Sequence, residues 1–244
     1  MPSQAKAYIS LIIASGTLLL LLAAASWSPE NLRQFVLYLG LAVLASALKV
    51  RIPGMESTIS PNFAFLLLGM VALPFSQVVV VSLIASLVQS VWASARRPRL
   101  VQVAFSAAAL VLSSSLAYKF SHLVLVGSGA ESPVVCVLLA GSLYLPVNSA
   151  LVSMVIGLVE GQPLKKVCAR CYDWVFPYFM VGIAFAGLVS GVYASSAVWK
   201  GALVLLPTMT LTYVYFANRS ARALPSMMLP SSTEDEEYPA EVSS

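Results

Sequence analysis

Side chains suited to catalysis are scarce in this chain of 244 residues. His122 is the only histidine, so a metal site built from several histidines is excluded. No nucleophile elbow, no H-E-x-x-H zinc motif and no phosphate-binding P-loop occurs. We therefore expect a protein that is not an enzyme and that carries no cofactor and no metal.

The cysteines and the histidine leave a few alternatives open. Cys168 and Cys171 form the sequence CARC, which has two-thiol spacing, but a four-thiolate zinc site needs a second pair. We expect two reduced thiols in a cytoplasmic loop, with redox or metal chemistry as the alternative. His122, near Lys119, is either a polar residue at the membrane surface or a proton sensor, since histidine titrates near neutrality.

The sequence LYLPVNSA is a stronger candidate for binding a ligand. Asn148 places an amide in the middle of an apolar run, with Tyr144 one helical turn before it and Pro146 between them. Polar groups at such depth in a membrane are scarce and are usually paired or functional. Asn148 is expected either to make a hydrogen bond between helices or to form one wall of a pocket.

A second polar group surrounds the sequence LKVRIPGMESTISPNFAFLLLGM. It contains Glu56 and Asn62, and an apolar run follows that ends before Pro74 and is too short for an ordinary membrane span. Helix ends inside a membrane must be buried in protein or line a cavity. The hairpin 62–93 is therefore a candidate pocket element. The expected ligand-binding residues are Tyr144, Asn148, Asn62, Glu56 and Gln89.

The elements that hold these residues follow from composition. The chain is 59% hydrophobic and 10% charged, whereas soluble domains are about 25% charged. We expect an all-α, multi-pass bundle of about eight spans, because an open sheet edge cannot face lipid. Ser28, Pro29 and Glu30 have the types that begin a helix. The expected spans are 8–27, 33–50, 62–74, 76–93, 101–124, 132–158, 173–194 and 198–218.

The basic residues predict the orientation of the bundle. With a cytoplasmic N-terminus, eleven of the fourteen lysines and arginines lie in inside segments, and only Arg33, Lys119 and Lys200 lie outside. We expect a bacterial inner-membrane protein with both termini in the cytoplasm. Charge does not decide whether 62–93 crosses the membrane twice or forms a re-entrant hairpin that returns to the same side.

The end of the chain differs from the rest. The last eleven residues hold five acids and no base. Together with Pro225 and Pro230, they predict a disordered acidic cytoplasmic tail at 223–244, after a membrane domain at 1–222.

Two stretches carry a resemblance to a known family. The sequences ASALKVRIPGMESTISPNFAFLLLGMVAL and LVQSVWASARRPRLVQVAFSAAALVL, within residues 45–112, resemble bacterial membrane-associated sensor domains of the MASE type. Such domains precede GGDEF diguanylate cyclases and HD-GYP phosphodiesterases. The resemblance implies a sensor domain, and since neither catalytic module follows Arg222, it transfers no catalytic residue.

Three functions remain open on the sequence. The first is a sensor or ligand-binding domain that relays a signal to a partner. The second is a vitamin-binding subunit of a transporter, because the hairpin is similar in fold to the substrate-binding subunits of energy-coupling-factor transporters. The third is a structural membrane protein. Expected partners are the lipid bilayer and either a cytoplasmic signalling protein or a second copy of the chain, but not nucleic acid.

Overall fold

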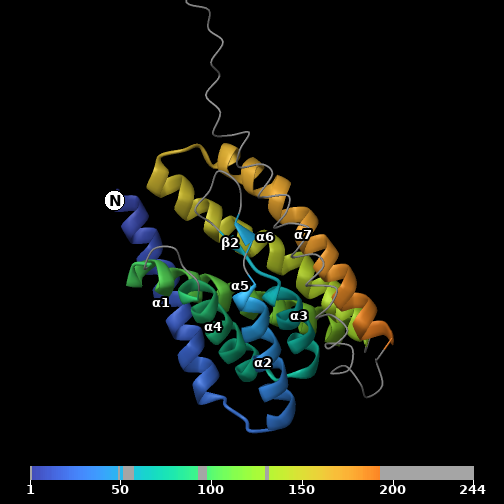
Figure 1. Ribbon diagram of the computed structural model, residues 1–244. Coiled ribbons are helices and arrows are strands. Elements are labelled where there is room, and N and C mark those ends of the chain that lie inside the picture. The colour runs from blue at the N-terminus through green and yellow to red at the C-terminus, as the bar shows by residue number, and fades with distance from the viewer. Residues whose placement is uncertain (1, 49, 52–57, 93–97, 130–131, 193–244) are drawn as a thin grey trace, which may run out of the picture.

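A computed structural model describes residues 2–48, 50–51, 58–92, 98–129 and 132–192. These residues form a helical bundle with one short antiparallel ladder (Figure 1). The helices are α1 (Ser3–Ala25), α2 (Leu32–Ala47), α3 (Asn62–Ala72), α4 (Phe75–Val91), α5 (Leu100–Ser128), α6 (Pro133–Glu160) and α7 (Leu164–Val192), and the strands are β1 (Val50–Arg51) and β2 (Thr58–Ile59).

The predicted all-α class is confirmed, and the first seven expected spans each overlap a helix, although α7 begins at Leu164 and not at 173. Three helices, α1, α5 and α6, are long and apolar enough to cross a membrane, which indicates a membrane protein. The other described helices contain shorter apolar stretches. The number of eight spans is therefore not confirmed, and the last expected span at 198–218 lies outside the described residues.

The connection between α1 and α2 corrects one sequence expectation. The helix does not begin at Ser28–Glu30 but at Leu32, after Asn31 in the left-handed conformation (φ 55°). The backbone oxygens of Ser28 and Glu30 instead accept hydrogen bonds from Gln77 on α4. A long-range contact has thus overridden a local helix-start signal.

The long helices end and begin where local chemistry allows. Gly129 and Gly161 end α5 and α6 with φ of 64° and 66°, a conformation that glycine adopts without a steric penalty. Ser132 caps α6 by accepting a hydrogen bond from the Val135 backbone nitrogen. Pro146 lies inside α6 without ending it.

The short helix α3 lies in the middle of the bundle. All residues from Ser60 to Met70 are buried, and α3 contacts α2, α4, α6 and α7. Its eleven residues rise about 16 Å, roughly half of a hydrocarbon layer. The expectation that this short helix is enclosed by protein is therefore met from Asn62 to Met70, and the last two residues, Val71 and Ala72, are half-buried.

The outer helices have apolar surfaces. On α1, Leu11, Leu18 and Leu21 are each more than half exposed. Such a continuous apolar face is costly in water and is ordinary in contact with lipid. Figure 1 shows α1 along one side of the bundle and α6 beside α7 along another.

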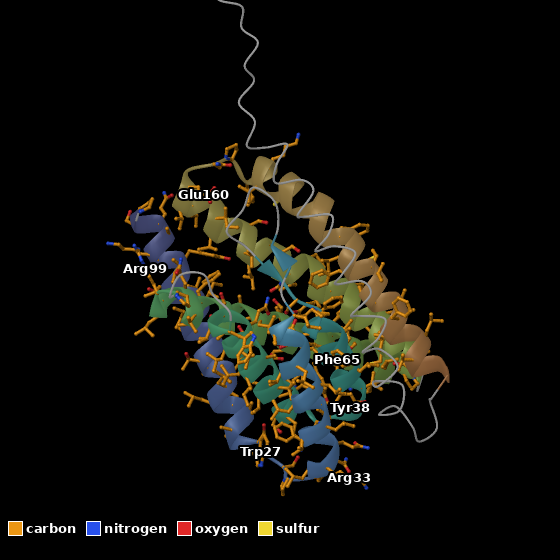
Figure 2. The ribbon with its side chains drawn as sticks, in the orientation of Figure 1. Trp27, Arg33, Tyr38, Phe65, Arg99 and Glu160 are labelled. Atoms are coloured by element: carbon orange, nitrogen blue, oxygen red, sulfur yellow. The ribbon has the colours of Figure 1, made fainter. Side chains whose placement is uncertain are left out.

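Four residues labelled in Figure 2 mark two opposite ends of the bundle. Figure 2 shows Arg99 and Glu160 at one end, and Trp27 and Arg33 at the opposite end. The first two belong to segments that the basic-residue count placed inside, and the last two to a segment placed outside. The ends of the bundle therefore agree with the expected grouping of the loops.

Candidate functional site

The most polar part of the interior is a hydrogen-bonded cluster at the start of α3. The Nδ2 atom of Asn62 donates to Ser46 Oγ on α2 and to Gln89 Oε1 on α4, each at 3.1 Å. Ser46 in turn donates to the backbone oxygen of Ala42 at 2.7 Å. One amide therefore ties together an end from each of three helices.

Because these side chains are buried, losing their hydrogen bonds would cost free energy. Asn62 is 3% exposed and Ser46 is fully buried, while Gln89 is half-buried. An amide moved into an apolar interior without partners costs several kcal/mol. Ser60, two positions before Asn62, is 4% exposed, and its hydroxyl has no partner within the described part of the chain. The neighbourhood of Asn62 thus contains unused hydrogen-bonding capacity.

The hairpin turn sets the register of this cluster. α3 ends at Ala72, and Pro74, which has no backbone N–H, occupies the N-cap position of α4. The chain therefore reverses and brings Gln89 back beside Asn62, 27 positions earlier. Two of the five expected ligand residues, Asn62 and Gln89, are in direct contact.

Tyr144 of α6 is connected to α3 by a series of stacked aromatic rings. Its ring stacks on Phe179 of α7 at 6.0 Å, and Phe179 stacks on Phe63 at 4.1 Å. The Phe63 ring also lies against Gly182, where an added Cβ would overlap it. Phe63, the residue after Asn62, is thus packed against α7, and Tyr144 of α6 is connected to it through Phe179.

Of the two remaining expected residues, Asn148 and Glu56, the structure describes only Asn148. Asn148 is half-buried, and its side chain makes no hydrogen bond within the described ranges, so the expected bond between helices is not found there. Glu56 lies outside the described residues. The expected loop position of the CARC thiols is wrong, because Cys168 and Cys171 both fall within α7 (Leu164–Val192). Cys168 is free and exposed, and the side chain of Cys171 is not described.

Sequence reasoning missed a second polar tie, at the other end of the hairpin. Gln77 is fully buried, and its Nε2 donates to the backbone oxygens of Ser28 at 3.1 Å and Glu30 at 2.6 Å. Its Oε1 is buried without a partner among the described residues. A glutamine three residues after Pro74, within an apolar run, was the available signal, but its partners come from a distant loop.

The chemistry of the Asn62 cluster is neutral. Its members are amides and hydroxyls, which donate and accept hydrogen bonds but do not transfer protons near neutral pH. Among the described residues, no group of three histidine, cysteine, aspartate or glutamate side chains is placed to hold a metal. The arrangement suits recognition of polar groups.

Comparison with known proteins adds no assignment. No protein-family model, no curated protein and no solved structure matches this chain.

Proposed function

We propose that this chain is a membrane-embedded sensor domain without its own catalytic module, which responds at the Asn62 cluster and relays the change to a partner. The observation that carries the proposal is the Asn62 amide, which holds α2, α3 and α4 together inside an apolar bundle. A ligand that competes for these hydrogen bonds changes how the three helix ends meet. Polar groups at such positions in membrane proteins are usually paired or functional, and a pair that a ligand can replace is both.

A physical connection from the cluster to α7 supports the relay. Phe63 follows Asn62 directly, stacks on Phe179 and lies against Gly182. Because the ring has no free space on the side of Gly182, a shift of the α3 start requires Phe63 or α7 to move. α7 is the last helix that the structure describes, and the chain continues from it toward the C-terminus.

We place the protein in the bacterial inner membrane with both termini in the cytoplasm. The support is the distribution of eleven basic residues to one side and three to the other. In this orientation the Asn62 cluster lies toward the cytoplasmic side and Gln77 toward the outside. The partner is a cytoplasmic signalling protein, or a second copy of the chain.

The experiment joins residues 1–222 to the catalytic part of a diguanylate cyclase and measures cyclase activity in membranes. Gly182→Ala places a methyl group against Phe63 and should change activity at least twofold. Gly187→Ala is the matched control, because an added Cβ there meets nothing within 4 Å. Equal activity of both variants and the parent, at equal expression, would contradict the relay.

An uptake experiment with the unfused chain distinguishes the sensor from the transporter alternative. A vitamin-binding subunit accumulates labelled vitamin when it is produced with an energy-coupling ATPase module, whereas a sensor does not. We expect no accumulation from a panel of labelled vitamins. Uptake that depends on Asn62 would replace the sensor proposal with the transport one.

A further inference from the structure

A second cluster of reactive side chains lies away from Asn62, where the end of α5 meets the start of α6. A shallow depression of about 160 Å³ opens there. Its lining residues are Val71, His122, Leu125, Ser132, Pro133 and Cys136. The imidazole of His122 and the buried thiol of Cys136 therefore border the same depression.

Hydrogen bonds organise the two groups. Ser121 Oγ lies 3.7 Å from the sulfur of Cys136, which donates to it, and 3.4 Å from Nδ1 of His122. Ser121 also donates to the backbone oxygen of Tyr118 at 3.0 Å. Ser121 is fully buried and Cys136 is 3% exposed. One hydroxyl thus contacts both groups and holds them in a single cluster.

The histidine tautomer follows from its partner. His122 Nδ1 lies 2.9 Å from the Tyr118 backbone oxygen. A carbonyl oxygen only accepts, so Nδ1 carries the proton and the neutral ring keeps a lone pair on Nε2. A backbone carbonyl that fixes the tautomer in this way is the usual outer partner of a metal-binding histidine. The ring also stacks on Tyr118 at 4.0 Å, which holds its plane.

We propose that Cys136 and His122 form a two-ligand site for a soft monovalent cation, copper(I) or silver(I). Thiolate is the ligand that such ions prefer, and imidazole binds them as well. On binding, the Cys136 thiol releases its proton to water, the sulfur and Nε2 each donate an electron pair, and the oxidation state of the metal does not change. Ser121 can then turn its hydroxyl hydrogen toward the thiolate.

Ligand number and charge select this class of ion. Zinc sites use at least three protein ligands, and no third metal-binding side chain joins the pair within the described residues. Calcium and magnesium require oxygen ligands, and no carboxylate lines the depression. A thiolate with a monovalent cation is neutral overall, which suits the apolar surroundings of Val71 and Leu125.

The test uses the full-length protein in detergent, with Cys168→Ser and Cys171→Ser to remove the CARC thiols as competitors. Copper(I) is titrated without oxygen against bicinchoninate. We expect one bound ion, and an affinity at least tenfold lower in Cys136→Ser and in His122→Gln. Leu125→Val, which keeps the lining apolar, is the matched control and should bind as the parent does.

Direct spectroscopy keeps the test independent of variant folding. X-ray absorption of the copper-loaded parent should show one sulfur and one nitrogen ligand. Absence of tight binding, unchanged affinity in either ligand variant with an unaltered melting temperature, or sulfur ligands alone would overturn the proposal. None of these outcomes depends on the sensor role of the Asn62 cluster.

Discussion

The side-chain nitrogen of Asn62 lies 3.1 Å from the amide oxygen of Gln89, and both amides belong to a hairpin surrounded by apolar residues. The same nitrogen reaches Ser46 on a third helix. Side-chain hydrogen bonds between membrane helices contribute about 0.6 kcal/mol on average. A cluster of this kind therefore stabilises one arrangement only modestly, which is what a switchable contact requires.

Asn62→Leu removes both bonds and leaves Gln89 Oε1 without this donor. The free energy of unfolding in detergent should fall by about 1–2 kcal/mol, the range around two average side-chain hydrogen bonds between membrane helices. Asn148→Leu is the matched control, because Asn148 makes no side-chain hydrogen bond with the described residues, and it should change stability by less than about 0.5 kcal/mol. Equal losses of unfolding free energy in the two variants would show that the hydrogen bonds of Asn62 do not contribute to stability.

Gln77→Leu tests the tie between α4 and the loop before α2. It removes the donor to two backbone oxygens, those of Ser28 and Glu30, at similar volume. Leaving buried acceptors unpaired costs about 1–3 kcal/mol, so the melting temperature should fall clearly. Gln34→Leu, at an exposed position of α2, is the control. A Gln77 variant as stable as its control would mean that water replaces the amide without loss.

Gly16→Ala tests the crossing of α1 and α5. An added Cβ at Gly16 would lie 2.6 Å from the Cβ of Ala108 and 2.7 Å from its Cα, so the two helices must separate. Overpacking of this kind costs about 1–3 kcal/mol. Gly40→Ala meets nothing within 4 Å and should instead stabilise α2 by about 0.5–1 kcal/mol, because alanine favours helix. Opposite signs in an unfolding titration are the expected result, and a neutral Gly16→Ala would contradict this crossing.

The orientation of the bundle can be tested at the two ends of α6, which should lie on opposite sides of the membrane. Alkaline phosphatase, which is active only outside the cytoplasm, is fused after Gly129 or after Gly161. The basic-residue distribution places the first position outside and the second inside. The first fusion should be strongly active and the second inactive. The reverse pattern would invert the whole orientation.

The sequence predicted the helices well because their signal is local. Long apolar runs and the prolines and glycines between them set the limits of α5 and α6 within a few residues. The helix start expected at Ser28–Glu30 was wrong, although the expected span from 33 was close, because the backbone oxygens of Ser28 and Glu30 accept hydrogen bonds from Gln77, 47–49 positions away. No local pattern reveals such a partner.

The candidate site was predicted in part for the same reason. Asn62 and Gln89 stand out as amides within apolar sequence, and the hairpin turn at Pro74 brings them together. Ser46 was not selected, since a single serine in a helix is common and usually bonds to its own backbone. The stacking of Tyr144 on Phe179 depends on how α6 packs on α7, which the sequence of either helix alone does not specify.

The central claim is that the Asn62 cluster acts on α7 through Phe63, and one comparison in the cyclase fusion tests it most directly. Cyclase activity is measured for Asn62→Leu in the parent and again in a Phe63→Ala background, with expression and unfolding free energy recorded for each protein. We expect that Asn62→Leu changes activity at least twofold in the parent and leaves it unchanged in the Phe63→Ala background. An equal change in both backgrounds, or no change in the parent while the protein remains folded, would contradict it.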